Sequence, residues 1–284
     1  MKVLVFGKTG QVARALIAAG SDHGVQVTAL GRNEADLNNP AACAAAIADA
    51  QADAVINAAA WTAVDAAEDQ EAAAHVINAD APGAMAQACA AKGVPFVHIS
   101  TDYVFDGSEG PAWTPDAPTG PLGAYGRTKR AGEQQVTAAG GNSAILRTAW
   151  VFDATGKNFV TTMLRLSDTR DALTVVGDQV GGPTPAAAIA DACLTMAKAL
   201  AAGQGRSGIY HFSGAPNVSW ADFARAIFAT AGRETSVTDI PTADYPTPAA
   251  RPANSRLDCT SLQTTFGISR PDWQAALSDM FASS

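Results

Sequence analysis

The chain has 284 residues, a hydrophobic content of 48% and a formal net charge of −8, with an isoelectric point near 4.9. This length allows one large domain or a domain with a smaller lobe, and it supplies enough apolar residues for a sizeable core. The acidic balance argues against a nonspecific binder of nucleic acid or anionic membranes, which needs a basic surface. Anionic ligands stay open, because backbone amides and a few cations can hold a phosphate.

The cysteines are scattered through the chain without a CxxC pair, at Cys43, Cys89, Cys193 and Cys259. This pattern favours reduced packing residues over disulfides or a metal site. The sequence has neither a signal-peptide pattern nor an apolar run of about 18 residues. We therefore expect a cytoplasmic protein.

The first element is an apolar run at residues 3–6 that ends at Gly7 and is typical of a parallel strand buried on both faces. A glycine-rich turn follows, and residues 12–19 read as a helix. Strand, glycine turn and helix are the context that dinucleotide binding requires, although an ordinary tight turn is the alternative. The predicted cofactor contacts of this turn are Gly7, Thr9, Gly10, Gln11 and Val12.

The second predicted strand spans residues 25–30 and is followed by Gly31 and Arg32. NAD-selective proteins usually place an acidic residue here for the ribose hydroxyls. Arginine instead suits a 2′-phosphate, because its planar guanidinium always carries a charge. We predict NADPH as the cofactor, with NADH still possible. The competing interpretation is an arginine that faces solvent.

The next strands bring small and polar residues to their carboxyl ends, where open α/β sheets bind ligands. Residues 54–57 form the third strand, and the small side chains after it leave room for a cofactor. The predicted contacts there are Ala58, Ala59 and Ala60. Residues 95–100 form the fourth strand, which leads to Thr101 and Asp102. We interpret His98 on this strand as a core residue and not as a catalyst.

A loop rich in proline and glycine, residues 107–123, precedes a predicted helix over 125–139. Tyr125 and Lys129 lie four residues apart, on one face of that helix. A fixed ammonium favours the phenolate and lowers the tyrosine pKa from its usual value near ~10, so the pair can transfer a proton. The competing interpretation is an exposed tyrosine packed on a lysine stem.

The first 150 residues alternate between strand and helix, which predicts a Rossmann-type doubly wound parallel sheet with a smaller C-terminal substrate-binding lobe. We assign residues 1–150 to an NAD(P)-binding Rossmann domain, to which later segments return, and residues 151–284 mainly to the lobe. The later predicted strands are 144–148, 173–176 and 209–212, and the later predicted helices are 157–166, 184–202, 220–231 and 271–281.

Seven blocks of the sequence, taken together, resemble the extended short-chain dehydrogenase/reductase family and, within it, the dTDP-4-dehydrorhamnose reductases. The blocks run from residue 6 to residue 258 and read FGKTGQV, NAAAWTAVDAAE, STDYVFDG, YGRTKRAGE, RTAWVF, GDQVGGPT and YPTPAARPANSRLD. The resemblance implies NAD(P)H-dependent reduction of the C4 carbonyl of dTDP-4-dehydro-L-rhamnose, the last step in making dTDP-L-rhamnose.

The resemblance also implies roles for individual residues. Thr101, Tyr125 and Lys129 correspond to the catalytic set, and Tyr125 and Lys129 also contact the cofactor. Asp36 and Leu37 correspond to positions beside the adenine. The implied substrate contacts are Val64, Asp65, Thr101, Asp102, Tyr103, Trp150 and Arg251. Trp150 can equally be a core residue, and Arg251, like its neighbour Arg256, can equally be a salt-bridge residue.

One position departs from the family pattern. Some members are metal-linked homodimers that use a glutamate near the first helix, where this chain has Ala15. We predict no metal requirement and a monomer or weak homodimer. Two alternative functions stay open at this point. One is another nucleotide-sugar 4-reductase or epimerase, and the other is a non-catalytic protein like the regulatory subunit of methionine adenosyltransferase. Loss of a catalytic residue would have favoured the second.

Overall fold

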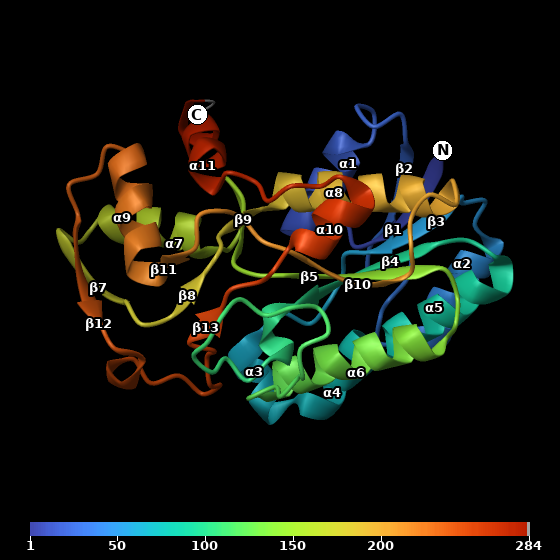
Figure 1. Ribbon diagram of the computed structural model, residues 1–284, viewed down its shortest axis with the longest axis horizontal. Coiled ribbons are helices and arrows are strands. Elements are labelled where there is room, and N and C mark those ends of the chain that lie inside the picture. The colour runs from blue at the N-terminus through green and yellow to red at the C-terminus, as the bar shows by residue number, and fades with distance from the viewer. Residues whose placement is uncertain (283–284) are drawn as a thin grey trace.

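A six-stranded parallel sheet forms the centre of the computed structural model, which describes residues 1–282 (Figure 1). The strand order is β10-β5-β4-β3-β1-β2, and each neighbouring pair is parallel. The bounds are β1 (Lys2–Phe6), β2 (Gln26–Leu30), β3 (Ala54–Asn57), β4 (Phe96–Thr101), β5 (Ser143–Thr148) and β10 (Gly208–Phe212). This arrangement confirms the predicted Rossmann-type sheet.

Helices cover both faces of the sheet, which explains why β1 and β3 are continuous apolar runs. One face carries α1 (Gln11–Ala19) and α8 (Ala186–Ala201), which pack on each other. The other face carries α2 (Pro40–Asp49), α5 (Ala81–Lys92) and α6 (Ala124–Ala138) (Figure 1). The predicted helices therefore form the two outer layers of the doubly wound fold.

A smaller lobe lies beyond one end of the sheet, at the left of Figure 1. Its core includes the buried aromatic residues Phe152, Phe223 and Trp273. Its main elements are α7 (Phe159–Ser167), β7 (Ala172–Val176), α9 (Trp220–Thr230), β12 (Ser236–Ile240) and α11 (Trp273–Ala282). Short strands connect it: β6 (Val151–Phe152), β8 (Val180–Gly181), β9 (Thr184–Pro185), β11 (Val218–Ser219) and β13 (Asn254–Ser255).

The chain passes more than once between the sheet and the lobe. After β6 and α7 in the lobe, α8 packs against α1 and β10 extends the sheet beside β5. The chain then returns to the lobe through α9 and β12. The sequence analysis did not predict β12 or α10 (Thr260–Phe266), because neither shows a strong apolar periodicity.

The helical region around residue 78 is irregular. It consists of α4 (Glu71–His75) and a π-helical turn, η1 (Val76–Asp80), and α3 (Val64–Asp69) precedes them. Such π-turns occur often near functional sites. Asn78 on η1 binds the backbone N–H of Trp61 and the hydroxyl of Thr128 on α6. The irregular turn therefore connects the segment after β3 to the helix that carries Tyr125.

The order of the strands reverses at β1, which has β2 on one side and β3 on the other. In open α/β sheets a ligand crevice forms at the carboxyl edge beside such a reversal. The turn after β1, the segment after β3 and Thr101 at the end of β4 all lie at this edge. The predicted cofactor and catalytic residues thus share one side of the sheet.

Candidate active site

The turn between β1 and α1 has the local geometry that a dinucleotide phosphate requires. Gly7 has a φ of 112°, and a Cβ there would lie 3.2 Å from the Cβ of Ala13. Gly10 caps α1 without any side-chain hydrogen bond to the helix. The first amides of α1 therefore keep no side-chain acceptor, and a helix N-terminus of this kind binds anions. Thr9 and Gly10 are exposed, while Val12 packs inward.

Arg32, just after β2, is exposed and makes no hydrogen bond or ion pair with the residues that the structure describes. Beside it, Lys8 forms an ion pair with Glu34 at 3.1 Å, and Glu34 accepts a hydrogen bond from the backbone of Gly31. The Lys8 contact lowers the pKa of Glu34. Sequence reasoning missed Lys8 and Glu34. Lys8 and Glu34 thus lie beside Gly31, the residue that precedes Arg32.

Asp36 and Leu37 follow on the same side of the sheet. The Asp36 carboxylate accepts a hydrogen bond from the backbone of Asn38 at 3.0 Å, and Leu37 is buried in the core. After β3, Ala58, Ala59 and Ala60 remain partly exposed. The predicted adenine side therefore combines the carboxylate of Asp36 with the apolar Leu37, and three small alanines stand on the predicted nicotinamide side.

The helix α6 lies unusually close to its neighbours. A Cβ on Gly132 would come within 2.0 Å of the carbonyl oxygen of Asn78. Glycine therefore permits a backbone contact that any other residue would block. This approach holds Tyr125 and Lys129, which sit on the preceding turns of α6, against the carboxyl end of β4.

Tyr125 and Thr101 are neighbours in the structure, as the sequence analysis predicts. Burial raises the pKa of the Tyr125 phenol to about 12, and the nearby Thr101 side chain acts in the opposite direction. The ring of Tyr103 packs edge-on against Tyr125, with centroids 5.4 Å apart. A phenol with this pKa is protonated at neutral pH, but it is a weaker acid than an ordinary tyrosine, so burial alone moves Tyr125 away from the pKa that favours a general acid.

The expected lowering of the Tyr125 pKa by Lys129 is wrong for this structure. The Lys129 side chain is only 2% exposed, and its ammonium nitrogen donates to the carbonyl oxygen of Ile99 at 2.7 Å. That nitrogen also lies 3.3 Å from Nε2 of His98. Burial lowers the pKa of Lys129 to about 8, against the opposing charge of Glu133. The lysine is therefore directed at β4 and not at the phenol.

Asp102 is a buried carboxyl group next to the predicted catalytic residues. The Thr101 hydroxyl donates to its Oδ1 at 3.0 Å, and its Oδ2 has no hydrogen-bond partner among the described residues. Burial raises the pKa of Asp102 to about 6, while the side chains of Ser255 and Thr101 act in the opposite direction. Such a perturbed acid beside a tyrosine and a threonine is typical of a functional site.

Arg251 and Asp65 meet at the outer side of the same region. One guanidinium nitrogen of Arg251 lies 2.8 Å from each carboxylate oxygen of Asp65, and Val64 precedes Asp65 at the start of α3. Two predicted substrate contacts are thus paired with each other. Arg256, by contrast, bonds Asn254 and the carbonyl oxygen of Gly110, so it holds the loop that precedes α6.

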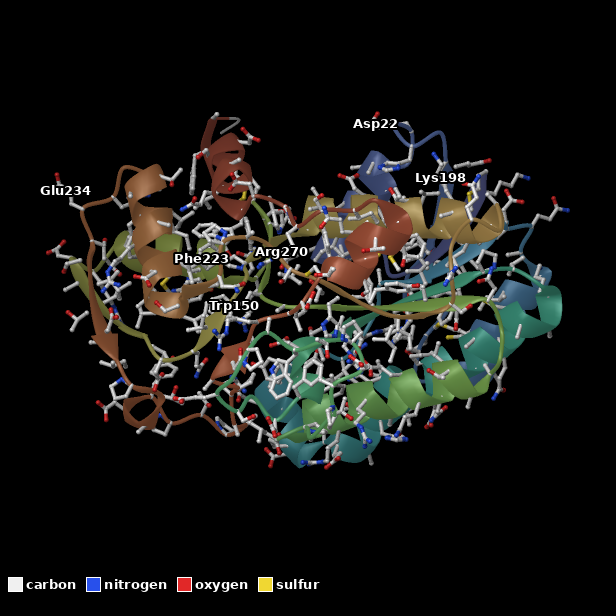
Figure 2. The ribbon with its side chains drawn as sticks, in the orientation of Figure 1. Asp22, Trp150, Lys198, Phe223, Glu234 and Arg270 are labelled. Atoms are coloured by element: carbon white, nitrogen blue, oxygen red, sulfur yellow. The ribbon has the colours of Figure 1, made fainter. Side chains whose placement is uncertain are left out.

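Trp150 lies on the side of the lobe that faces the sheet (Figure 2). Its ring stacks on Trp220 with centroids 3.5 Å apart and an angle of 12°. Its φ is 51°, a left-handed conformation that is rare for a bulky residue and recurs at functional sites. The ring stays partly exposed. A substrate contact for Trp150 stays a prediction.

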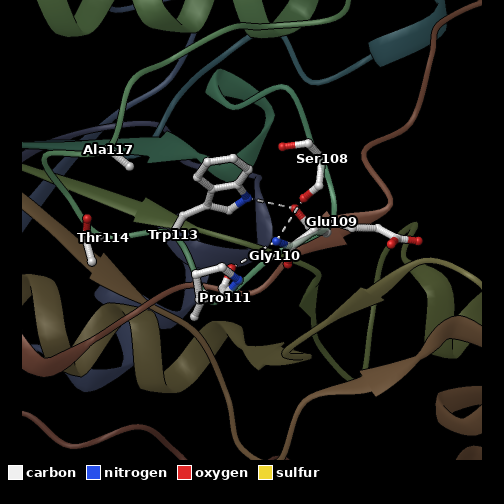
Figure 3. Close-up of a pocket in the computed structure, with 9 residues that line it drawn as sticks. Ser108, Glu109, Gly110, Pro111, Trp113, Thr114 and Ala117 are labelled. Atoms are coloured by element: carbon white, nitrogen blue, oxygen red, sulfur yellow. Dashed lines mark hydrogen bonds between the residues drawn. The ribbon is translucent and has the colours of Figure 1, made fainter.

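One cavity of the described residues is lined by none of the predicted catalytic residues. It measures about 300 Å³ and is formed by the loop that precedes α6 (Figure 3). Its lining residues are Ser108, Glu109, Gly110, Pro111, Ala112, Trp113, Thr114, Ala117 and Asn254. Trp113 closes its inner side by donating to the carbonyl oxygen of Asn254, the neighbour of Ser255. Because its walls hold few charged groups, the carboxyl edge of the sheet is the better candidate for an anionic nucleotide.

Two classes of feature are missing from residues 1–282. No helix there is both long and apolar enough to cross a bilayer. The same residues contain no group of three or more His, Cys, Asp or Glu side chains that could hold a metal ion. The independence from metal stays a prediction.

Comparisons with known proteins agree with this geometry. The family model described as RmlD substrate binding domain matches residues 1–284. A dTDP-4-dehydrorhamnose reductase of Sinorhizobium fredii is 45% identical, with 96% of this chain and 94% of the relative covered. The corresponding Burkholderia thailandensis protein is 46% identical, with 98% and 97% covered.

Solved structures give the same result. A dTDP-4-dehydrorhamnose reductase of Clostridium acetobutylicum superimposes with a TM-score of 0.93 at 36% identity, covering 100% of this chain and 99% of the other. The Bacillus anthracis enzyme, solved in complex with NADP, has a TM-score of 0.93 at 30% identity and the same coverage. The family-model match and these full-length likenesses show that this chain belongs to the dTDP-4-dehydrorhamnose reductase family.

Proposed function

We propose that this protein reduces the C4 carbonyl of dTDP-4-dehydro-L-rhamnose to give dTDP-L-rhamnose, with NADPH as the preferred cofactor. The observation that carries the proposal is the meeting of Thr101, Tyr125 and Asp102 at the carboxyl edge of the sheet, beside the phosphate-binding turn at Gly7. The full-length likeness to reductases of this name supports the substrate, and the NADP complex of the Bacillus anthracis relative supports the cofactor.

The chemistry needs one hydride and one proton. NADPH supplies the hydride to the carbonyl carbon when it is bound. Tyr125 donates its phenolic proton to the carbonyl oxygen as negative charge develops there. Thr101 orients the same oxygen. Lys129 forms a hydrogen bond with the nicotinamide ribose. Through this ribose it returns a proton to Tyr125 after the reaction.

The cofactor and substrate follow from the residues around the crevice. The turn at residues 7–12 holds the pyrophosphate, and Arg32 with Lys8 holds the 2′-phosphate. Ala58, Ala59 and Ala60 leave space for the nicotinamide half. Arg251 binds the diphosphate of the nucleotide sugar, and Trp150 packs against the sugar. In this proposal the sheet and its helices form the cofactor domain, and the lobe completes the substrate site.

The assay follows the loss of nicotinamide absorbance with dTDP-4-dehydro-L-rhamnose as substrate and NADPH or NADH as cofactor, with and without EDTA. We expect rapid oxidation that is faster with NADPH and is unchanged by EDTA. Oxidation that EDTA abolishes would keep the reductase function and overturn the independence from metal. The proposal also places the reaction in the cytoplasm, with the protein as a monomer or weak homodimer.

The two alternatives give different results in the same assay. A different nucleotide-sugar enzyme would bind NADPH but turn over a UDP- or GDP-sugar in preference to the dTDP substrate. A non-catalytic regulatory protein would bind nucleotide without oxidising it with any of these sugars. The likeness to a UDP-glucose 4-epimerase, at 16% identity and a TM-score of 0.83, concerns the fold alone and favours neither.

A further inference from the structure

A continuous line of polar contacts runs through the sheet to Lys129. It starts at the backbone N–H of Ala59, passes through the side chains of Asn57 on β3 and His98 on β4, and ends at the Lys129 nitrogen. Asn57 and His98 are 1% and 0% exposed, so water does not compensate for a poor contact. Each hydrogen-bond donor in this line must therefore face an acceptor on the neighbouring residue.

The orientation of the Asn57 amide is fixed at one end of this line. Its Oδ1 accepts a hydrogen bond from the backbone N–H of Ala59 at 3.1 Å. A backbone N–H only donates, so the amide cannot turn over without placing two donors face to face. The Nδ2 group therefore points to Nδ1 of His98, which lies 3.2 Å away.

The Asn57 orientation fixes the tautomer of His98. Burial holds the pKa of His98 well below its usual value, so the ring is neutral. A neutral imidazole has one N–H and one acceptor nitrogen. Since Nδ1 accepts from Asn57, the ring proton must sit on Nε2, which is the nitrogen that faces Lys129.

This arrangement restricts the charge of Lys129. An N–H on His98 that points at Nζ meets an acceptor only if Lys129 is an uncharged amine, because an ammonium has no lone pair. The amine can then donate one of its own hydrogens to the carbonyl oxygen of Ile99. Burial already lowers the pKa of Lys129 to about 8. An N–H of His98 that points at Nζ favours the neutral amine as well.

The other charged and titratable groups around Lys129 do not remove this restriction. Glu133, one turn further along α6, favours the ammonium. Its carboxylate is already occupied, since Arg147 on β5 forms an ion pair with it at 2.7 Å and Ser100 donates to it at 2.5 Å. Tyr125 carries no charge at neutral pH because its pKa is raised.

We propose that Asn57 and His98 are positioning residues that hold Lys129 as a neutral amine in the cofactor-free protein, so that Lys129 takes up a proton when NADP binds. The proton uptake rests on the proposed function, because it needs the phosphates of a bound dinucleotide to favour the ammonium of Lys129. The first half concerns the protein alone. Lys129 then carries the proton that the reaction needs, and it carries this proton only when the cofactor is bound.

The first experiment measures the His98 tautomer in the cofactor-free protein by nitrogen NMR of ¹⁵N-histidine-labelled samples. The chain has only four histidines, and loss of one ring in His98→Gln assigns the signal. We expect a protonated Nε2 and a bare Nδ1 for His98. A protonated Nδ1 with a bare Nε2 would overturn the proposal, because Lys129 would then be the donor. This result does not depend on any enzymatic activity.

The second experiment uses Asn57→Asp to reverse the direction of the hydrogen bonds that His98 makes with residue 57 and with Lys129. One carboxylate oxygen still accepts from Ala59, and the other accepts from Nδ1–H of His98, so the ring proton moves and Lys129 becomes the donor. We expect the NMR pattern of His98 to invert. Asn142→Asp, which adds the same charge at an exposed position at the opposite end of the sheet, serves as the control and keeps the wild-type pattern.

The third experiment measures proton uptake during NADPH binding by calorimetry in two buffers of different ionisation enthalpy. NADPH is used because its dihydronicotinamide ring is uncharged, whereas the nicotinamide of NADP⁺ is a cation. The pH is about 8, close to the pKa that burial gives Lys129. We expect uptake in the wild type and in Asn142→Asp, and a loss of most of it in Asn57→Asp. Equal uptake in all three proteins would overturn the role of the line. Absence of NADPH binding would count against the proposed function and leave the NMR result standing.

Discussion

Arg251 and Asp65 lie 186 residues apart in the chain and form a close ion pair, with one guanidinium nitrogen 2.8 Å from both carboxylate oxygens. The pair joins the start of α3 to the segment before β13. Arg251 is only one fifth exposed on its side chain, so the contact is partly shielded from solvent. We interpret Asp65 as the residue that aims Arg251 at the substrate diphosphate.

Replacement of Arg251 by lysine tests that interpretation. Lysine keeps the charge but lacks the planar fork, and the loss of a charge-assisted hydrogen bond costs about 1.5–3 kcal/mol. We expect Arg251→Lys to raise the KM for the nucleotide sugar by about tenfold or more, with a smaller change in kcat. Asp65→Asn should raise KM by a smaller factor. An unchanged KM in Arg251→Lys would show that the arginine only ties the two segments together.

Arg32 should decide the cofactor preference together with Lys8. Because a 2′-phosphate is present in NADPH and absent from NADH, Arg32→Ala should raise the KM for NADPH more than the KM for NADH. Steady-state kinetics with both cofactors measure the ratio, and Arg170→Ala, another exposed arginine, is the control. Equal increases for the two cofactors would place Arg32 away from the 2′-phosphate.

The sequence and the structure agree best where a pattern is local. Apolar runs such as residues 3–6 predict buried parallel strands, and the glycine turn at Gly7 predicts a cofactor site from neighbouring residues alone. The pairing of Tyr125 with Thr101, 24 residues earlier, followed only from the family resemblance. The sequence also pointed to Asp102, but burial gives this carboxyl its raised pKa, and burial depends on the whole fold.

The contacts that sequence reasoning missed join residues from different strands. His98 was interpreted as an ordinary core residue because it lies in an apolar strand, and its burial agrees with that. Its contact with Lys129 depends on how α6 crosses β4, which no sequence spacing encodes. Lys8 and Glu34 likewise meet only because β1 and β2 are neighbours. A tautomer or an ion pair of this kind needs the three-dimensional arrangement.

Asp102 should make stability depend on pH. Its folded pKa of about 6 exceeds the ordinary value of 3.8, so the folded state binds more protons than the unfolded state between these values. Stability should therefore fall as the pH rises from about 4 to about 6, by up to about 3 kcal/mol from this group. Asp102→Asn should remove that part of the slope in thermal or denaturant unfolding. Identical slopes for the two proteins would contradict the raised pKa.

Gly132 should be required for the position of α6. A Cβ there would meet the carbonyl oxygen of Asn78 at 2.0 Å, so Gly132→Ala must move the helix backbone. We expect a loss of about 1–3 kcal/mol of stability despite the better helix propensity of alanine, together with reduced turnover. Gln134→Ala, at an exposed position on the same helix, is the control and should leave both unchanged. If Gly132→Ala had the stability of the wild type, α6 and the backbone at Asn78 would be packed less tightly than this contact requires.

The central claim is that Tyr125 gives its proton to the substrate oxygen, and Tyr125→Phe tests it most directly. The variant removes only the phenolic oxygen, so NADP⁺ affinity should stay close to that of the wild type. Single-turnover oxidation of bound NADPH by dTDP-4-dehydro-L-rhamnose should slow by about 10²–10⁴-fold, the usual contribution of a general acid. Tyr245→Phe, on an exposed tyrosine, is the matched control. A Tyr125→Phe protein that oxidises NADPH at the wild-type rate would contradict the account.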